Sequence, residues 1–149
     1  MNDRLSLKEI SDRIAANTTL PGTTHYGTSF DRDYVDKIQQ PGSAMPQVWV
    51  VAQRFNATDD GTKYSGLIRQ SGKVEVVVRA IFQRYADGQL SGEQAASDIH
   101  TAVRKQLLGW MPTGANRPLV WSSEKDGYAT ESLPTLDMIF VTEIDCEGE

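Results

Sequence analysis

The chain contains 149 residues, of which 39% are hydrophobic and 23% are charged, as expected for one ordinary folded domain. The net charge of −5 argues against a protein that reads DNA sequence, and the single cysteine, Cys146, excludes an internal disulfide and a cysteine-rich zinc site. No run of about 18 apolar residues could span a membrane, and the first residues lack the apolar segment of a secretory signal. Composition therefore predicts a soluble cytoplasmic domain.

The first predicted element is a helix from Leu5 to Ala16. Ser6 and Glu9 have the spacing of a capping box, in which the hydroxyl and the carboxylate each accept a hydrogen bond from a free N–H group at the helix start. Residues 17–46 are punctuated by proline and glycine, so we expect an extended loop region there. Within this region, Asp31–Gln39 could form either a short helical turn or an edge strand.

Strand signals follow. Gln47–Phe55 is rich in β-branched and aromatic residues and predicts a strand. Asn56–Lys63 is polar and acidic and predicts an exposed loop, which we expect to contact a neighbouring subunit or another protein. Tyr64–Gln70 could form a short strand that ends in a turn at Ser71 and Gly72.

The strongest strand signal is Lys73–Tyr85, where apolar residues alternate along the chain. Both faces are partly apolar, which predicts a central strand. After a turn at residues 86–88, Ser91 and Gln94 have capping-box spacing and predict a helix that runs to Leu108. We expect one strand face to pack against the apolar stripe of this helix; the residues are Val74, Val76, Val78, Ala80 and Phe82 on the strand and Ile99, Val103 and Leu107 on the helix.

Near the C-terminus, Leu119–Ser122 and Tyr128–Thr130 can pair as a hairpin across a turn that contains Asp126-Gly127. Leu136–Ile144 predicts a last strand. The order of elements favours an α+β fold: a mainly antiparallel β-sheet with two principal helices packed on one face, and long loops. We expect one domain over residues 1–149, divided into an N-terminal helix (1–16), the extended loop region (17–46), a sheet with the second helix (47–144) and a frayed acidic tail (145–149).

Residues capable of catalysis are few and scattered. His25 lies in a polar loop, and His100 lacks a metal-ligand partner three or four residues away on its helix. Cys146 has acidic neighbours, which raise a thiol pKa and oppose its use as a nucleophile. The sequence has no nucleotide-binding glycine loop and no nucleophile elbow. We therefore expect no catalytic residue, no cofactor and no metal, and hence no enzyme.

Aromatic residues carry more information. Trp49 lies in a predicted strand and is expected in the core, whereas Trp110 and Trp121 are either core or partly buried residues or interface anchors. A helix ending in Leu108-Gly109-Trp110-Met111-Pro112 leads into a proline and glycine loop, an aromatic hairpin and a final hydrophobic strand. This arrangement, over Val48–Ile144, resembles the tail terminator (tail completion, minor tail) proteins of long-tailed bacteriophages.

The resemblance implies a virion structural protein at the head-proximal end of the tail, assembled in the host cytoplasm. It implies a homo-oligomeric ring of six subunits that caps the tail tube protein, stops its growth and presents a surface to the head–tail connector or neck proteins. Genomic DNA would pass through the lumen without sequence-specific binding, which suits an acidic chain. The residues we expect in interaction surfaces are Asp59, Asp60, Lys63, Trp110 and Trp121.

Three other interpretations remain open. The chain could be a head–tail connector protein, which is also small and ring-forming. It could be a small ligand-binding or enzymatic α+β domain with a pocket near Trp49, His25 and Asp31–Gln39. It could also be a plain interaction adaptor.

Overall fold

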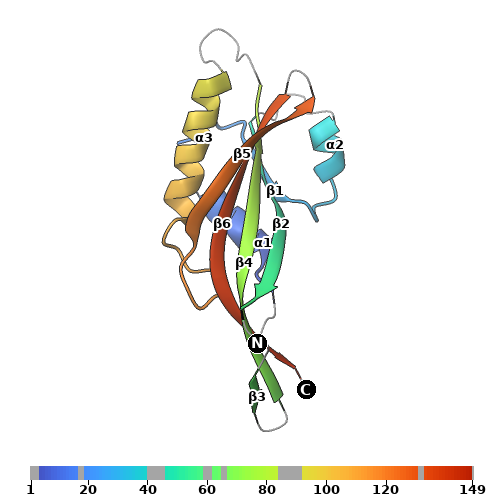
Figure 1. The fold of residues 1–149 in the computed structure, drawn as a ribbon. Helices are drawn as coiled ribbons and strands as arrows, with labels where there is room; N and C mark the ends of the chain where they lie inside the picture. The colour runs from blue at the N-terminus through green and yellow to red at the C-terminus, as the bar shows by residue number, and fades with distance from the viewer. Residues whose placement is uncertain are drawn as a thin grey trace.

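The computed structural model describes residues 4–16, 19–39, 46–58, 62–64, 67–83, 92–130 and 133–148. Its strands form one sheet of order β1-β2-β4-β6-β5, and β3 pairs with β4 off this path. Figure 1 shows the sheet as a long twisted layer with α1 and α3 on one side. The elements in chain order are α1 Leu7–Ala15, β1 His25–Thr28, α2 Tyr34–Gln39, β2 Gln47–Ala57, β3 Thr62–Tyr64, β4 Leu67–Ile81, α3 Gly92–Leu107, β5 Val120–Thr130 and β6 Leu133–Gly148.

The main core lies between the sheet and the helices α1 and α3. β4 pairs antiparallel with β2 on one side and with β6 on the other, so the predicted central strand is confirmed. Alternate side chains of β4 enter one buried cluster with the helix stripe, as predicted from the two periodicities. The cluster includes Val74, Val76, Val78, Ala80 and Phe82 from the strand region and Ile99, Val103 and Leu107 from α3. The predicted α+β class is confirmed.

The start of α1 uses half of the predicted capping box. The Ser6 hydroxyl accepts a hydrogen bond from the Glu9 N–H at 3.2 Å. The Glu9 carboxylate, however, accepts hydrogen bonds from the backbone N–H and the hydroxyl of Thr113, at 3.0 and 3.1 Å. The carboxylate therefore ties α1 to the loop before β5, a long-range contact that local spacing does not reveal.

The expected loop region over residues 17–46 contains one strand that the sequence did not predict. His25–Thr28 forms β1, which pairs parallel with β2, and the open choice for Asp31–Gln39 is resolved as the helix α2. α2 covers the sheet face opposite α1 and α3, where Tyr34 and Ile38 pack against a second buried cluster of Trp49, Ile81 and Leu133. Trp49 is thus a core residue, as predicted.

The expected loop at Asn56–Lys63 and the expected turn at Ser71-Gly72 are also corrected. β2 continues to Ala57, Lys63 lies in β3, and β4 runs without a break from Leu67 to Ile81. Gly72 sits inside the strand because a Cβ atom there would lie 2.3 Å from the Phe55 ring and 2.6 Å from the Asn56 carbonyl oxygen. This glycine gives room for a neighbouring strand rather than for a turn.

The C-terminal strands are longer than predicted. Val120–Thr130 is one strand that pairs with β6, so Asp126-Gly127 is strand and not a turn. The expected frayed tail is wrong for Asp145 to Gly148, because these residues pair with Ser71 to Ile68 of β4. Helix α3 ends at Leu107, and Ser91 and residues 86–88 lie outside the described residues.

A narrow projection, here called the arm, extends from the body of the protein (Figure 1). It consists of β3, residues 67–72 of β4 and residues 144–148 of β6. The Ser71 hydroxyl donates a hydrogen bond to the Asp145 carboxylate at 2.5 Å, and this bond lowers the pKa of Asp145. Cys146 is half-buried in the arm, opposite Gln70.

Candidate assembly interface

One edge of the sheet is the long strand β5, the last strand in the sheet order. Large apolar side chains stand exposed along it: Val120 is 53% exposed, Trp121 39% and Tyr128 66%. An edge strand presents backbone N–H and C=O groups that a second chain can bind, and soluble proteins usually protect such edges. A long edge that carries exposed aromatic residues therefore indicates a surface for another protein.

The start of β5 is held against the end of α3. Gly109 adopts a left-handed conformation with φ of 83° and ends the helix. Its N–H donates to the Leu119 carbonyl oxygen at 2.8 Å, and the Leu119 N–H donates to the Trp110 carbonyl oxygen at 2.8 Å. Four exposed apolar side chains lie close to these bonds in the chain, and Tyr128 is exposed farther along the strand. We call these five residues the β5 patch: Leu108, Met111, Val120, Trp121 and Tyr128.

One side chain of α3, His100, contacts Trp121. The His100 ring meets the indole edge to face, with ring centres 5.0 Å apart. His100 Nε2 lies 3.3 Å from the Glu124 carboxylate, which is on the same face of β5. An aromatic side chain that is already held in one rotamer loses little entropy when a partner covers it.

The opposite edge of the sheet carries a second exposed apolar group. Phe30, which follows β1, is 76% exposed, and Val35 on α2 is 54% exposed. We call this pair the β1 patch. β1, which leads to Phe30, and β5 are the first and last strands of the sheet order, whereas α2, which carries Val35, packs over one face of the sheet.

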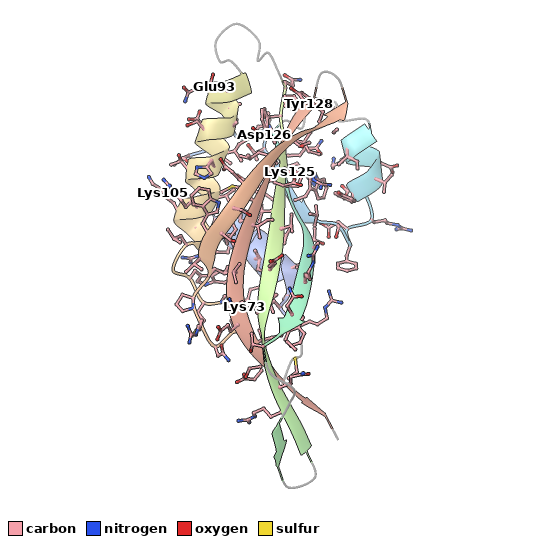
Figure 2. All side chains as sticks on the ribbon, in the orientation of Figure 1. Lys73, Glu93, Lys105, Lys125, Asp126 and Tyr128 are labelled. Atoms are coloured by element: carbon pink, nitrogen blue, oxygen red, sulfur yellow. The ribbon has the colours of Figure 1, made fainter. Side chains whose placement is uncertain are left out.

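A pocket of about 610 Å³ opens between α2 and the far part of β5. Tyr34 and Ile38 line it from α2, and residues 125–129 line it from β5. Figure 2 shows Lys125, Asp126 and Tyr128 along this part of β5.

The floor of this pocket is an ion pair. Arg79 donates two hydrogen bonds to the Asp137 carboxylate, at 2.8 and 2.9 Å. These bonds raise the pKa of Arg79, so the guanidinium stays charged. Its charge is already neutralised by Asp137, which leaves the floor without a free charge to attract a charged ligand.

The predicted interaction residues have different positions. Asp59 and Asp60 lie outside the described residues, and Lys63 lies in β3 of the arm. Trp110 is half-buried below the Arg13 guanidinium, whose carbon lies 5.5 Å from the ring centre. Trp121 is exposed on β5. Trp110 therefore lies beside α1, Trp121 lies beside α3, and Lys63 lies in the arm.

Sequence reasoning missed Phe30, Val35 and Tyr128. The signal for Phe30 was a large aromatic residue inside a polar stretch, Ser29 to Asp33, with no apolar periodicity to place it in a core. Of the two histidines, His25 stacks on Trp49 with ring centres 4.8 Å apart, and burial lowers its pKa. Within the described ranges, no three His, Cys, Asp or Glu side chains form a group that could hold a metal ion. No helix there is long and apolar enough to cross a membrane.

Comparisons with known proteins agree with this fold. The family model of the phage tail terminator protein matches residues 4–146. No curated protein matches the chain. Among solved structures, a chain from the virion of a native gene transfer agent particle is similar at a TM-score of 0.50 and 16% identity, over 68% of this chain and 69% of that chain. That likeness concerns the fold, whereas the family match spans nearly the whole sequence. The chain therefore belongs to the phage tail terminator family and is a structural protein of the virion tail.

Proposed function

We propose that six copies of this protein form a ring that caps the head-proximal end of the tail tube. One face of the ring matches the open end of the tube, and the other face does not repeat that surface, so no further tube subunit adds. The outer face then receives the head–tail connector or neck proteins. The observation that carries this proposal is that exposed apolar side chains stand on the edge strand β5 and, separately, on the segment from the other edge strand, β1, into α2.

Ring closure requires an interface in which two different surfaces meet around a rotation axis. The β5 patch and the β1 patch are two such surfaces, and they differ in composition. The β5 patch of one subunit packs against the β1 patch of the next, and repetition of this contact closes the ring. A self-complementary dimer would instead need one patch that pairs with itself.

The arm supplies the second contact. It projects beyond the body of the sheet (Figure 1), which suits a contact with the tube or with a subunit that the body does not reach. Asp59, Asp60 and Lys63 belong to the segment that precedes β4 and form part of this contact in our proposal. Trp110, whose carbonyl oxygen accepts from the Leu119 N–H before β5, borders this contact in our proposal.

The charge of the protein suits passage of DNA. A net charge of −5 per chain gives a six-membered ring an acidic balance, and an acidic lumen does not retain phosphate groups. DNA then moves through the ring without sequence-specific binding.

The decisive experiment is tail assembly with and without this protein, with tube lengths measured by electron microscopy. Without the protein we expect overlong tubes that fail to join heads. Uniform tubes of normal length that still join heads would refute the terminator role. Tubes of normal length that no longer join heads would instead identify a connector protein.

A matched pair of variants tests the β5 patch within the same assay. Trp121→Glu places a charge at the centre of the exposed patch and should give overlong tubes. Ser123→Glu adds the same charge two residues along the exposed strand and serves as the control. Both positions are exposed, so both variants should fold as the wild type does, which thermal unfolding checks.

A further inference from the structure

We propose that α2 is a pH-sensitive clamp: it stays docked on the sheet while His25 is neutral, and it detaches when the His25 ring takes up a proton. The rest of the domain stays folded when the clamp opens. This inference goes beyond the proposed ring and concerns the single subunit, so its test does not depend on tail assembly.

Of the three helices in the described part of the chain, α2 has the weakest attachment to the body of the protein. From Tyr34 to Ile38, no side chain of α2 is fully buried, whereas α1 and α3 each bury four residues. Tyr34 and Ile38 pack on the small cluster around Trp49, which is separate from the main core (Figure 1). A helix of six residues is not stable alone in water, so α2 depends on this contact. Loss of the contact therefore releases α2 and leaves the main core intact.

The buried Trp49 connects His25 to α2. The His25 ring lies on the indole with ring centres 4.8 Å apart, and the Tyr34 ring meets the same indole edge to face at 4.9 Å. The Trp49 Nε1–H donates to the Gln47 side-chain oxygen at 2.9 Å, and the Gln47 Nε2–H donates to the Lys37 carbonyl oxygen at 2.9 Å. Trp49 and Gln47 are both 0% exposed. A change at His25 therefore reaches the groups that hold α2 in place.

The surroundings of His25 oppose a positive charge. Its Nε2 atom is buried and has no hydrogen-bond partner among the residues that the structure describes. Burial lowers the pKa of His25, and the Lys37 ammonium group on α2 lowers it further. Asp33 and Asp31 raise this pKa by smaller amounts, and Asp33 lies 3.9 Å from Lys37. Protonation of His25 thus adds a cation beside Lys37 at a place with little access to water.

The direction of the pH dependence follows from this pKa. A histidine ring in water takes up a proton below about pH 6.5, whereas the ring under a docked α2 takes it up at lower pH. The full docking free energy is therefore present above about pH 6.5. Below that value, docking weakens by up to about tenfold per pH unit, because the detached state binds one more proton. Arg79, opposite Trp49 on β4, is paired with Asp137 and keeps its charge throughout this range.

Detachment of α2 also changes the β1 patch. Val35 lies on α2, and Phe30 lies shortly before it in the chain. The two side chains then no longer form one surface. In the proposed ring, acid would weaken the contact made by this patch; this consequence rests on the proposed function, whereas the clamp itself does not.

Hydrogen exchange of the monomeric protein tests the clamp. The main probe is the Lys37 N–H, which donates to the Asp33 carbonyl oxygen at 2.9 Å within α2. After correction for the intrinsic exchange rate, its protection should fall by up to about tenfold per pH unit between about pH 6.5 and pH 5. Dilute urea should change this protection little, because a local opening exposes little surface. The amides of Val76 and Val78 in β4 exchange through global unfolding, so dilute urea should lower their protection.

The chain has two histidines, which provides a matched pair of variants. His25→Phe keeps an aromatic ring and cannot be protonated, so the protection of the Lys37 amide should stay flat over this pH range. His100→Phe makes the same change on α3 and should keep the wild-type response. Lys37→Met removes the cation beside His25 and should reduce the response of the amide at position 37, which tests the clamp even if His25→Phe does not fold. Circular dichroism at neutral pH checks the fold of each variant.

Three results would overturn the clamp. The first is protection of the Lys37 amide that does not fall with pH, and the second is an equal fall in His25→Phe. The third is a fall as sensitive to urea as that of the β4 amides, because the whole domain would then be unfolding. A protein that forms no ring and does not change tube length would refute the proposed function and leave the clamp untouched.

Discussion

Replacement of Val78 by aspartate tests the packing of the core. Val78 is 1% exposed and lies between Val50 of β2 and Met138 of β6 on the face that α1 and α3 cover. A carboxyl group there has no partner, so it stays protonated in the folded state at pH 7. Protonation of a group with an ordinary pKa of about 3.9 at pH 7 costs about 4 kcal/mol. Loss of the valine packing adds about 1.5 kcal/mol. The sum is comparable to the whole stability of a domain, roughly 5–15 kcal/mol.

The pH dependence identifies the cause. The folded-state pKa of the new carboxyl group is raised above its unfolded value, so its penalty grows as pH rises and shrinks as pH falls. Between about pH 7 and pH 5, Val78→Asp should regain about 1.4 kcal/mol per pH unit relative to wild type. Val78→Thr has a similar volume and no charge, and its smaller loss of about 1–3 kcal/mol should not vary with pH. Urea denaturation of the three proteins at several pH values measures both effects. A Val78→Asp protein as stable as wild type, or a penalty that is flat with pH, would refute this account of the core.

Three further predictions concern local features. Burial lowers the pKa of His25, so the free energy of unfolding should fall as pH drops below about 6.5. The His25→Phe variant keeps an aromatic ring against Trp49 and cannot be protonated, so its free energy of unfolding, measured in urea, should fall less over the same pH range. Gly72→Ala should lower the free energy of unfolding by about 1–3 kcal/mol because its Cβ would overlap Phe55, whereas Gly22→Ala meets nothing within 4 Å and should leave it unchanged. Ser6→Ala removes the side-chain cap of α1 and should lower the free energy of unfolding by about 1 kcal/mol, measured by thermal or urea unfolding. An unchanged free energy of unfolding would contradict the capping role of Ser6.

Long periodic segments could be predicted from the sequence. The alternation in β4 and the stripe of α3 each repeat several times, and burial follows such repeats because one face of each element must leave water. Short elements could not be predicted in this way. β1 spans four residues and contains Gly27, and it is a strand because β2 pairs with it, not because of its own composition.

Glycine misled the sequence-based prediction in two strands. Gly72 and Gly127 stand beside polar residues that are typical of turns, yet both lie inside strands. A side chain at Gly72 would collide with Phe55, and one at Gly127 would lie 2.9 Å from the Thr135 hydroxyl. These requirements arise from neighbouring strands that are distant in sequence. A single sequence does not show which glycines serve a turn and which serve a close approach.

The candidate interface was predictable only in part. Trp121 was identified because exposed aromatic residues are typical of interfaces, and the structure places it on an edge strand. Phe30 was missed because its exposure depends on a turn built from Thr28, Ser29 and Asp31, in which Ser29 bonds to β2. That β1 and β5 are the two edge strands depends on strand order, which local patterns do not determine.

The uninterrupted pairing of β4 with β6 has a mechanical consequence. β4 spans 15 residues and, at about 3.3 Å per residue, forms a rod of about 50 Å that leads from the middle of the sheet to the tip of the arm. The ladder between the two strands continues from Ile81 and Thr135 to Ile68 and Gly148 without a register shift. When the tip is pulled along the strand direction, the hydrogen bonds between β4 and β6 are loaded in shear together and do not break one after another. The continuous ladder therefore resists a pull directed along the arm and carries that load into the central strands of the sheet.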